Sequence, residues 1–175
     1  GVSWGDWCAR ILSRRLGGMG LVVVDPACWD GPADGRLRAL LPEAGRMAEA
    51  LAAQTAAISK AGYEPAVAPP EGTHLFEGTP EGRRRVRHGE EPRGALTPDV
   101  LLRPVLQGML LPAAAQISGP AEIAYAAQAH ALFAALGVPS PRAIPRMSLT
   151  LVDGRMERVM RRFADTVYDQ TRYER

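Results

Sequence analysis

The stretch ISGPAEIAYAAQ, residues 117–128, predicts a short strand, a tight corner and the first turns of a helix. Ser118 or Gly119 is expected to cap this helix, and Pro120 suits its first position. Glu122 stands where the acid of a capping box reaches back to the cap. A strand that passes directly into an alanine-rich helix is typical of α/β domains.

The same corner is a candidate binding site. Free backbone N–H groups at a helix start attract anions, but the Glu122 carboxylate competes for those donors and repels a phosphate. The residues alone therefore favour a well-capped helix. An anion site stays open as an alternative, and so does a site in which Glu122, with Tyr125 one turn later, holds an amine or a hydroxyl ligand.

A second stretch, GLVVVDP at residues 20–26, predicts a buried strand. It is a short valine-rich run bounded by glycine and by Asp-Pro, which is typical of a strand buried on both faces of a parallel sheet. Asp25 would then lie at the carboxyl end of that strand, where open α/β sheets bind ligands. The alternative is that Asp25 only caps the following turn.

The stretch LTPDVLLRPVLQGMLLP, residues 96–112, predicts a broken helix. Thr97 is a candidate cap with Pro98 at the first helical position, and Pro104 forces a break at Arg103 before a second helix that ends near Leu111. An arginine at a break is a candidate for holding a carboxylate or phosphate, and Gln107 one turn later points the same way. The alternative is a surface arginine in a loop.

The remaining segments complete a three-layer α/β prediction with a mostly parallel sheet. We expect a core at residues 1–153 that contains a hairpin insertion at about 63–95, and the start of a C-terminal helix at 154–175. The elements expected are a helix over 35–61 restarted at Pro42, a strand over 64–68, a hairpin turning at 79–82, a helix ending at Gly137, and a strand over 147–151 preceded by Arg146.

Composition narrows the functional classes. The 175 residues carry a net charge of +2 and no apolar run near the ~20 residues that span a bilayer, so no membrane partner is expected. The amino-terminal segment predicts an amphipathic helix rather than a signal peptide. Two cysteines, Cys8 and Cys28, favour packing roles and a reducing, cytoplasmic setting.

The charged and metal-binding residue types exclude two further classes. His74, His88 and His130 lack the spacing of metal ligands, so no metal is predicted. The run of Arg83, Arg84, Arg85 and Arg87 lacks interleaved aromatics. It therefore favours a solvated hairpin face over a nucleic-acid site.

Four of these blocks together resemble the BshC family, the cysteine-adding enzymes of bacillithiol synthesis. The blocks are GLVVVDP, LTPDVLLRPVLQGMLLP, GPAEIAYAAQ and PRAIPRMSLTLVD, and the resemblance covers about residues 4–163. It departs from the family pattern where Ser118-Gly119 replaces two glycines and where Gln116 replaces an aromatic residue. Glycine-rich and acidic blocks of the family's amino-terminal part have no counterpart here, so the chain resembles the second half of the family's core, and we expect the core in this chain to be incomplete.

The resemblance implies a Rossmann-like core and an activity. The coiled coil that pairs two chains of the family has no counterpart in this sequence, so a homodimer is expected only if that segment is present. The implied reaction joins cysteine to glucosaminyl-malate by an amide bond, with ATP or another nucleotide as a candidate activator of the carboxyl group. Arg103 and Arg146 would clamp malate or phosphate oxygens, and Glu122 would meet the cysteine ammonium. Gln107, Ser118, Gly119 and Tyr125 would then line the pocket, and the fragment alone is of doubtful activity.

Two other functions stay open. One is a non-catalytic α/β module that binds a small anion or a partner chain. The other is a nucleotidyltransferase-like enzyme with another substrate, since a Rossmann-like core serves many reactions.

Overall fold

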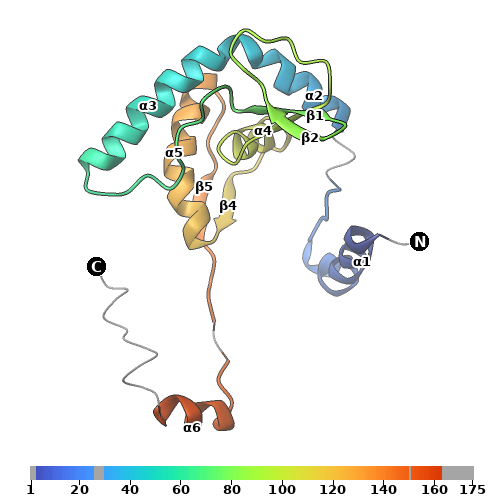
Figure 1. Ribbon diagram of the computed structural model, residues 1–175. Coiled ribbons are helices and arrows are strands. Elements are labelled where there is room, and N and C mark those ends of the chain that lie inside the picture. The colour runs from blue at the N-terminus through green and yellow to red at the C-terminus, as the bar shows by residue number, and fades with distance from the viewer. Residues whose placement is uncertain (1–2, 26–29, 150, 163–175) are drawn as a thin grey trace. The chain divides into compact units, whose positions relative to one another are not determined.

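The computed structural model describes residues 3–25, 30–149 and 151–162. The chain forms two compact units, Gly1–Pro145 and Arg146–Arg175. The described helices and strands are α1 (Trp4–Leu16), η1 (Gly17–Met19), α2 (Asp30–Ala39), η3 (Leu41–Glu43), α3 (Ala44–Lys60), β1 (Leu75–Thr79), β2 (Gly82–Arg85), β3 (Leu96–Pro98), α4 (Arg103–Leu110), β4 (Ala115–Ser118), α5 (Pro120–Leu136), β5 (Arg142–Pro145) and α6 (Gly154–Arg162) (Figure 1).

The strands form two small sheets, so the described residues make a mixed α/β structure. One sheet is antiparallel in the order β2-β1-β3, and the other pairs β4 with β5 in parallel. β4, α5 and β5 follow one another as a β-α-β unit, as an α/β domain requires. We predicted a three-layer domain with a mostly parallel sheet; in the described residues, the parallel part of that sheet is present only as the pair β4 and β5.

The core lies where α2, α3, α4 and α5 meet the antiparallel sheet. α3 lies against α5, and α4 contacts both α2 and α5 (Figure 1). A Cβ atom added to Gly108 would stand 3.0 Å from the Phe133 ring, so glycine permits the close approach of α4 and α5. The most deeply buried side chains of this core are Leu37, Met47, Leu51, Leu75, Leu101, Leu102, Val105 and Leu132.

Several predictions of local structure are confirmed. The hairpin forms as β1 and β2 with its turn between Thr79 and Gly82. The long helix occurs as α2 and α3, interrupted at η3 by Pro42. Gly62, with φ of +87°, follows α3 as a glycine that ends a helix does. The predicted domain limits at 153 and at about 63–95 stay a prediction.

Three predicted strands are wrong, and each for the same physical reason: a strand requires a hydrogen-bonded neighbour. Residues 21–25 have no regular structure, and Val22 is 79% exposed rather than buried. Residues 64–68 form no strand, and the backbone of Val67 in their middle is bound by a side chain of α5 instead of by a neighbouring strand. Near the carboxyl end, the strand is β5, which ends at Pro145; residues 147–149 and 151 form no strand, and residue 150 of the predicted strand lies outside the described residues.

Gln128 provides that replacement for a strand partner. Its side chain is fully buried in α5. The amide oxygen accepts from the Val67 backbone N–H at 2.9 Å, and the amide nitrogen donates to the Val67 carbonyl at 2.9 Å. One glutamine side chain thus satisfies both backbone groups of Val67 as a neighbouring strand would.

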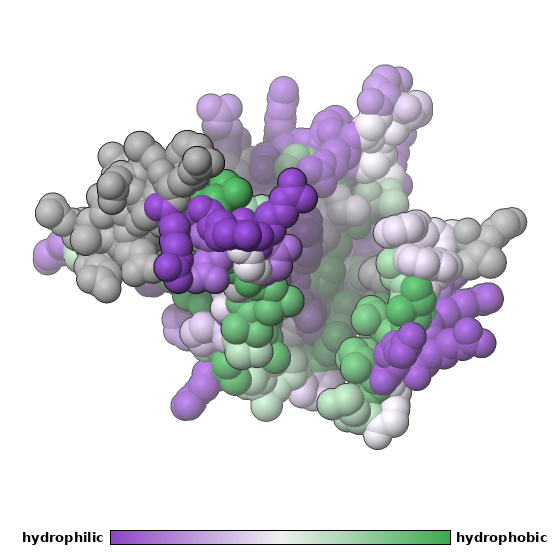
Figure 2. All heavy atoms as spheres, turned by 90° about the horizontal axis from the view of Figure 1, so that it is seen from below, coloured by the Kyte–Doolittle hydropathy of each residue, from purple (hydrophilic) through white to green (hydrophobic). Residues whose placement is uncertain are grey.

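Apolar side chains also reach the surface on several described elements (Figure 2). Trp4 and Trp7 of α1 stack on each other with ring centroids 5.0 Å apart, yet both are exposed. Ile117 of β4 is 69% exposed on the parallel pair of strands. None of the described helices is both long and apolar enough to cross a membrane.

Candidate functional site

The first residue of α4 is Arg103, and a buried aspartate fixes the turn before it. Asp99 accepts hydrogen bonds through Oδ1 from the backbone N–H groups of Leu101 and Leu102, both at 3.0 Å. The Arg103 N–H donates to the Asp99 carbonyl at 3.0 Å. The predicted helical turn from Thr97 and the break at Arg103 are wrong, because Thr97 pairs with Phe76 in the antiparallel sheet and Arg103 is already helical as the first residue of α4. The predicted second helix does form as α4, and Asp99 caps the turn that leads into it.

The second carboxylate oxygen of Asp99 joins α4 to the hairpin. Oδ2 lies 2.8 Å from His74 Nδ1 and 3.3 Å from the Arg85 guanidinium. Burial acts to raise the pKa of Asp99, but the hydrogen bond and charge of His74, the Leu102 N–H and Arg85 outweigh it and hold that pKa below its ordinary value. Asp99 is therefore a buried carboxylate that stays ionised.

His74 is itself 1% exposed, and its Nε2 has no hydrogen-bond partner among the described residues. Nδ1 lies 2.8 Å from the Asp99 carboxylate, which can only accept hydrogen bonds when it is ionised. His74 therefore acts in the core as a donor to Asp99, a role that the spacing of the histidines did not indicate.

The hairpin arginines are divided by the strand period of two. Arg83 and Arg85 lie on one face, where their guanidinium carbons stand 4.5 and 4.3 Å from the centroid of the Phe76 ring. Arg84 lies on the other face and pairs with Glu77 and Glu90. Arg83, Arg84 and Arg87 are exposed, so the predicted solvated arginine face is confirmed, and the Phe76 ring and the two carboxylates add contacts on it.

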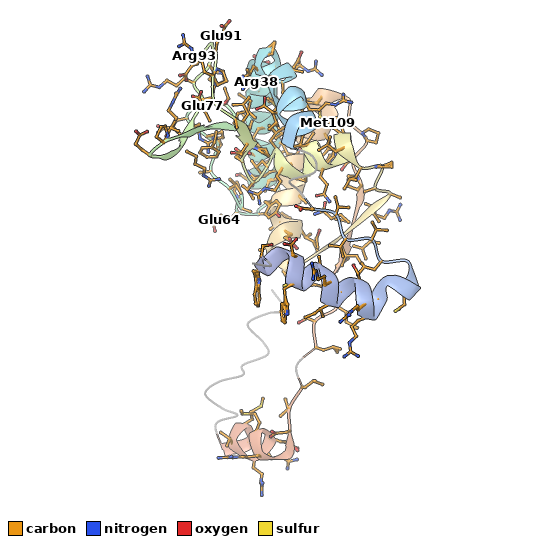
Figure 3. The ribbon with its side chains drawn as sticks, turned by 90° about the vertical axis from the view of Figure 1, so that its right-hand side faces the viewer. Arg38, Glu64, Glu77, Glu91, Arg93 and Met109 are labelled. Atoms are coloured by element: carbon orange, nitrogen blue, oxygen red, sulfur yellow. The ribbon has the colours of Figure 1, made fainter. Side chains whose placement is uncertain are left out.

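Glu77 ties the hairpin to the loop that precedes β3. Its Oε1 accepts from the backbone N–H groups of Arg93 and Gly94, each at 2.6 Å. These backbone bonds, with the charge of Arg84, outweigh burial and lower the pKa of Glu77. Figure 3 shows Glu77 and Arg93 close together beside the hairpin, with Arg38 on α2.

Arg38 fastens α2 to the same loop. Its Nε donates to Asp34 at 2.6 Å, and its two terminal nitrogens donate to the carbonyls of Pro92 and Gly94 at 2.7 Å each. The other Asp34 oxygen accepts from the Leu96 N–H at 2.8 Å. Burial acts to raise the pKa of Asp34, but the Leu96 and Arg38 hydrogen bonds lower it overall. Each nitrogen of Arg38 and each carboxylate oxygen of Asp34 thus takes part in an internal hydrogen bond.

A cavity of about 850 Å³ lies between α2, β3, the hairpin and α4, and we call it the α4 cavity. Its walls are mainly apolar and include Leu37, Leu96, Leu106 and Leu110. Polar side chains that line it are those of Asp34, Arg83, Thr97, Arg103 and Gln107. The structure thus brings together the predicted site residues Arg103 and Gln107, both with exposed side chains, and adds Arg83.

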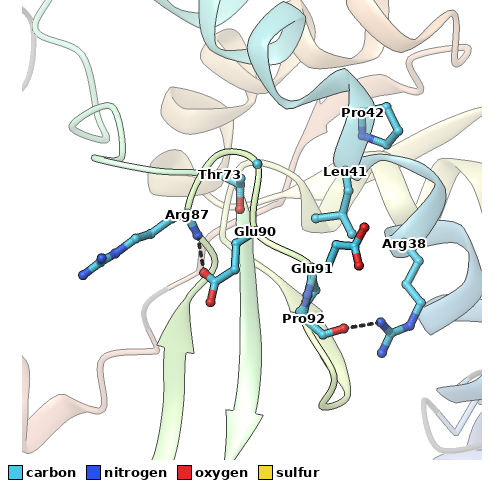
Figure 4. A pocket seen from close by; sticks show the side chains of 9 residues that line it. Arg38, Leu41, Pro42, Thr73, Arg87, Glu90, Glu91 and Pro92 are labelled. Carbon is cyan, nitrogen blue, oxygen red and sulfur yellow. Dashed lines mark hydrogen bonds between the residues drawn. The ribbon is translucent and has the colours of Figure 1, made fainter.

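A second cavity, of about 520 Å³, lies between η3 and the loop after the hairpin (Figure 4). Arg38 and Arg87 line it, together with Glu90 and Glu91. Arg38 is already bonded to Pro92, and the Glu90 carboxylate accepts from the Arg87 N–H at 3.0 Å (Figure 4). Its charged side chains are balanced in sign, so this cavity is the weaker candidate site.

The corner before α5 has the capped geometry. Ser118 is 1% exposed at the end of β4, and Gly119 caps α5 in an extended conformation. Glu122 Oε2 accepts from the Gly119 N–H at 2.6 Å, which confirms the predicted capping bond. Tyr125 is half-buried against the core. The lining of the α4 cavity includes none of these four residues.

Two further site predictions fall elsewhere. Asp25 is exposed in a segment without regular structure, so its predicted place at the end of a buried strand is wrong. Arg146 is exposed and begins the second compact unit. Cys8 is a free, half-buried cysteine in α1, and Cys28 lies outside the described residues.

Sequence reasoning missed Arg83 as a residue of the α4 cavity, and it missed Asp99 as the cap of the turn before α4. An aspartate just before a Leu-Leu-Arg-Pro run is a good cap, but Thr97 with Pro98 offered a competing cap two residues earlier. Only the pairing of residues 96–98 with β1 decides between them. Within the part of the chain that the structure describes, no group of three or more His, Cys, Asp or Glu residues forms a metal site.

Comparisons with known proteins agree on one family. A model described as the bacillithiol biosynthesis BshC N-terminal Rossmann-like domain matches residues 87–147. A protein named "Putative cysteine ligase BshC" from Heliobacterium modesticaldum is 31% identical over 184 residues, which cover 89% of this chain and 34% of that protein. One of the same name from Solibacter usitatus is 31% identical over 97% of this chain and 36% of its own length.

The chain spans about a third of the length of these curated relatives. A shorter match, to the protein of the same name from Salinibacter ruber, reaches 40% identity over 73 residues. The family match at residues 87–147 contains α4, the corner before α5 and both strands of the parallel pair.

Proposed function

We propose, from the premise that this chain belongs to the BshC family, that it forms part of an enzyme that adds cysteine to glucosaminyl-malate in bacillithiol synthesis. The observation that carries the proposal is the similarity to two BshC proteins over 89% and 97% of this chain. The small-molecule substrates are cysteine and glucosaminyl-malate, and the setting is the reducing cytoplasm.

The proposal places β4 and β5 in a larger, mostly parallel Rossmann-like sheet. Support comes from the parallel register of the pair, in which Ile117 faces Ile144, and from the helix α5 that connects the two strands. The 69% exposure of Ile117 also supports it, because a strand in a parallel sheet is ordinarily covered on both faces.

In amide formation, the α4 cavity and the corner before α5 would have separate tasks. The cysteine ammonium first loses a proton to water, and the neutral amine then attacks the activated carbonyl carbon. The activating group departs with the electron pair of its bond to that carbon, and a second amine proton passes to water. ATP or another nucleotide would supply that activating group. Arg103 and Gln107 would hold oxyanions of the acid, because a guanidinium and an amide both donate hydrogen bonds.

Glu122 would bind the cysteine ammonium. Its Oε2 is occupied by the Gly119 N–H. Its Oε1 is in no hydrogen bond that the structure shows within the described residues, and a carboxylate accepts on both oxygens. Ser118 and Tyr125 flank this corner, and Arg146 and Asp25 remain further candidates for substrate contact.

The test uses the full gene product with glucosaminyl-malate, cysteine and ATP, and detects bacillithiol by mass spectrometry. We expect product, and we expect Arg103→Ala to lower kcat/KM about 10- to 100-fold, because a hydrogen bond to a charged group contributes about 1.5–3 kcal/mol. Arg46→Ala is the control, since Arg46 is exposed on α3 and pairs only with Glu43. Product formation with unchanged kinetics in Arg103→Ala removes the role of Arg103.

Absence of product separates the alternatives. A protein that binds the substrates without turnover is a non-catalytic α/β module. A protein that turns ATP over with another acceptor is nucleotidyltransferase-like, which the same core permits.

A further inference from the structure

We infer that the α4 cavity binds a small organic molecule with at least two negative charges, and that Arg83 and Arg103 together hold it. This inference rests on the proposed function only in treating Arg103 as a substrate-binding residue. It adds Arg83, a hairpin residue that the sequence places on a solvated face.

Both arginines bring uncompensated positive charge to the cavity. Neither Arg83 nor Arg103 forms an ion pair within the part of the chain whose side chains the structure describes. The acid that lines the cavity, Asp34, is already bonded to Arg38 and to the Leu96 N–H. The cavity therefore contains two guanidinium groups without an ion-pair partner among the described residues, and one carboxylate, that of Asp34, which is paired with Arg38.

The hairpin arginine is held in place before any ligand arrives. The Arg83 guanidinium stands 4.5 Å from the Phe76 centroid, and the Arg85 guanidinium stands 4.3 Å from it. Arg85 is itself fixed by the Thr73 carbonyl at 2.7 Å and by Asp99 at 3.3 Å. A cation held against an aromatic ring loses less side-chain entropy on binding, so Arg83 is better prepared than a free surface arginine.

The second arginine stands at a helix start. Arg103 is the first residue of α4, and the turn before it is fixed by Asp99. The N–H groups of Leu101, Leu102 and Arg103 are bonded to Asp99, so the positive charge that the start of α4 offers to an anion in the cavity is that of the Arg103 guanidinium.

The walls define the rest of the ligand. Leu37, Leu96, Leu106 and Leu110 give the cavity a mainly apolar lining, and its volume of about 850 Å³ suits a small organic molecule. A simple inorganic anion would leave those walls in contact with water. Thr97 and Gln107 add a hydroxyl and an amide that can hydrogen-bond to the body of the ligand.

Carboxylates and phosphates share this oxyanion chemistry, so the test contains one probe of each kind. Binding of malate and of ADP to the full gene product is measured by calorimetry at low salt, with malamide and adenosine as their uncharged counterparts. We expect malate or ADP to bind, and we expect its uncharged counterpart to bind at least tenfold more weakly. Binding should weaken as salt rises, because two charged contacts are screened.

Variants identify the residues. Arg83→Ala and Arg103→Ala should each raise Kd about tenfold, and their effects should not be additive because both hold one ligand. Arg87→Ala is the matched control: it removes an arginine from the same hairpin region but lies outside the α4 cavity. Circular dichroism of each variant checks the fold.

The outcomes are distinct. Loss of affinity in Arg83→Ala but not in Arg87→Ala supports the inference, with malate or ADP naming the kind of anion. No binding of either probe, or equal effects of Arg83→Ala and Arg87→Ala, overturns it. Because binding is measured without turnover, a protein that makes bacillithiol but binds anions independently of Arg83 refutes only this inference. A protein that needs Arg83 for binding but makes no bacillithiol refutes only the proposed function.

Discussion

Replacing Asp99 should lower the stability of the fold strongly, because its small side chain makes several buried contacts. The side chain is 8% exposed and makes contacts on both oxygens. Oδ1 caps the turn before α4 through the Leu101 and Leu102 N–H groups, and Oδ2 contacts His74 and Arg85. Asp99→Ala removes all of these acceptors at once.

The expected loss follows from those contacts. Loss of a helix cap costs about 1 kcal/mol. The His74 Nδ1–H then remains buried without an acceptor, which costs about 1–3 kcal/mol more. We therefore expect Asp99→Ala to lower the free energy of unfolding by about 3 kcal/mol. Asp99→Asn keeps an oxygen for the cap but loses the charge opposite Arg85, so we expect about half that loss.

Urea unfolding followed by circular dichroism measures both variants. A lower midpoint at an unchanged slope shows a loss of stability rather than a change in the denatured state. A loss below about 1 kcal/mol for Asp99→Ala would refute the reasoning. Equal losses for Asp99→Ala and Asp99→Asn would show that the cap contributes nothing and that only the charge matters.

Three further predictions follow from single contacts. The Arg84 hydrogen bond lowers the pKa of Glu90 from 4.5 to about 2, so its contribution to stability is complete above pH 4.5 and is lost as the pH falls to about 2; the melting temperatures of wild type and Glu90→Gln should differ at pH 6 and converge near pH 2. Gln128→Leu leaves both backbone groups of Val67 unpaired, which should speed hydrogen exchange of the Val67 amide and cost about 2 kcal/mol in urea unfolding. Gly94→Ala places a Cβ 2.4 Å from a backbone oxygen and should lower the melting temperature, whereas Gly45→Ala in α3 meets nothing within 4 Å and should leave it unchanged or raise it.

The local elements that the sequence predicted correctly are those decided by neighbouring residues. The hairpin turn has Pro80 and Gly82 where a turn requires them, and it forms between β1 and β2. Glu122 lies three residues after Gly119, and the capping bond forms. Pro42 interrupts the helical stretch at η3. Each of these depends on contacts within a few residues along the chain.

The errors concern elements that depend on distant residues. An apolar run such as 21–24 resembles a buried strand in composition, but pairing decides whether it becomes one. The segment around Val67 is bound by Gln128, which is 61 residues away in the chain. No local sequence pattern predicts that a buried glutamine side chain will form the hydrogen bonds that a neighbouring strand would otherwise form. Near the carboxyl end, apolar and polar residues alternate over 147–151, but the residues that pair with β4 are those of β5, 142–145.

The candidate site shows the same division. A helix starting near Pro104 was predictable because proline is tolerated in the first turn of a helix, although Arg103 is helical where we expected a break. That Arg83 lines the cavity with Arg103 was not, because the two residues come from a hairpin and a helix that meet only in the folded chain. The predicted grouping of Arg103 with Glu122 in one cleft stays a prediction.

The geometry of the two arginines also explains why Asp99 matters beyond stability. Arg85 follows Arg83 on the same face of β2, and both stand against Phe76. Arg85 contacts Asp99, and Asp99 caps the turn from which α4 and Arg103 begin. One buried carboxylate therefore joins the two elements that carry the anion-binding side chains. It follows that Asp99→Asn, which retains the cap, should weaken malate or ADP binding while the protein is still folded, since the hairpin and α4 lose their shared ionic contact. Unchanged affinity in a folded Asp99→Asn protein would mean that the two arginines are positioned independently of this carboxylate.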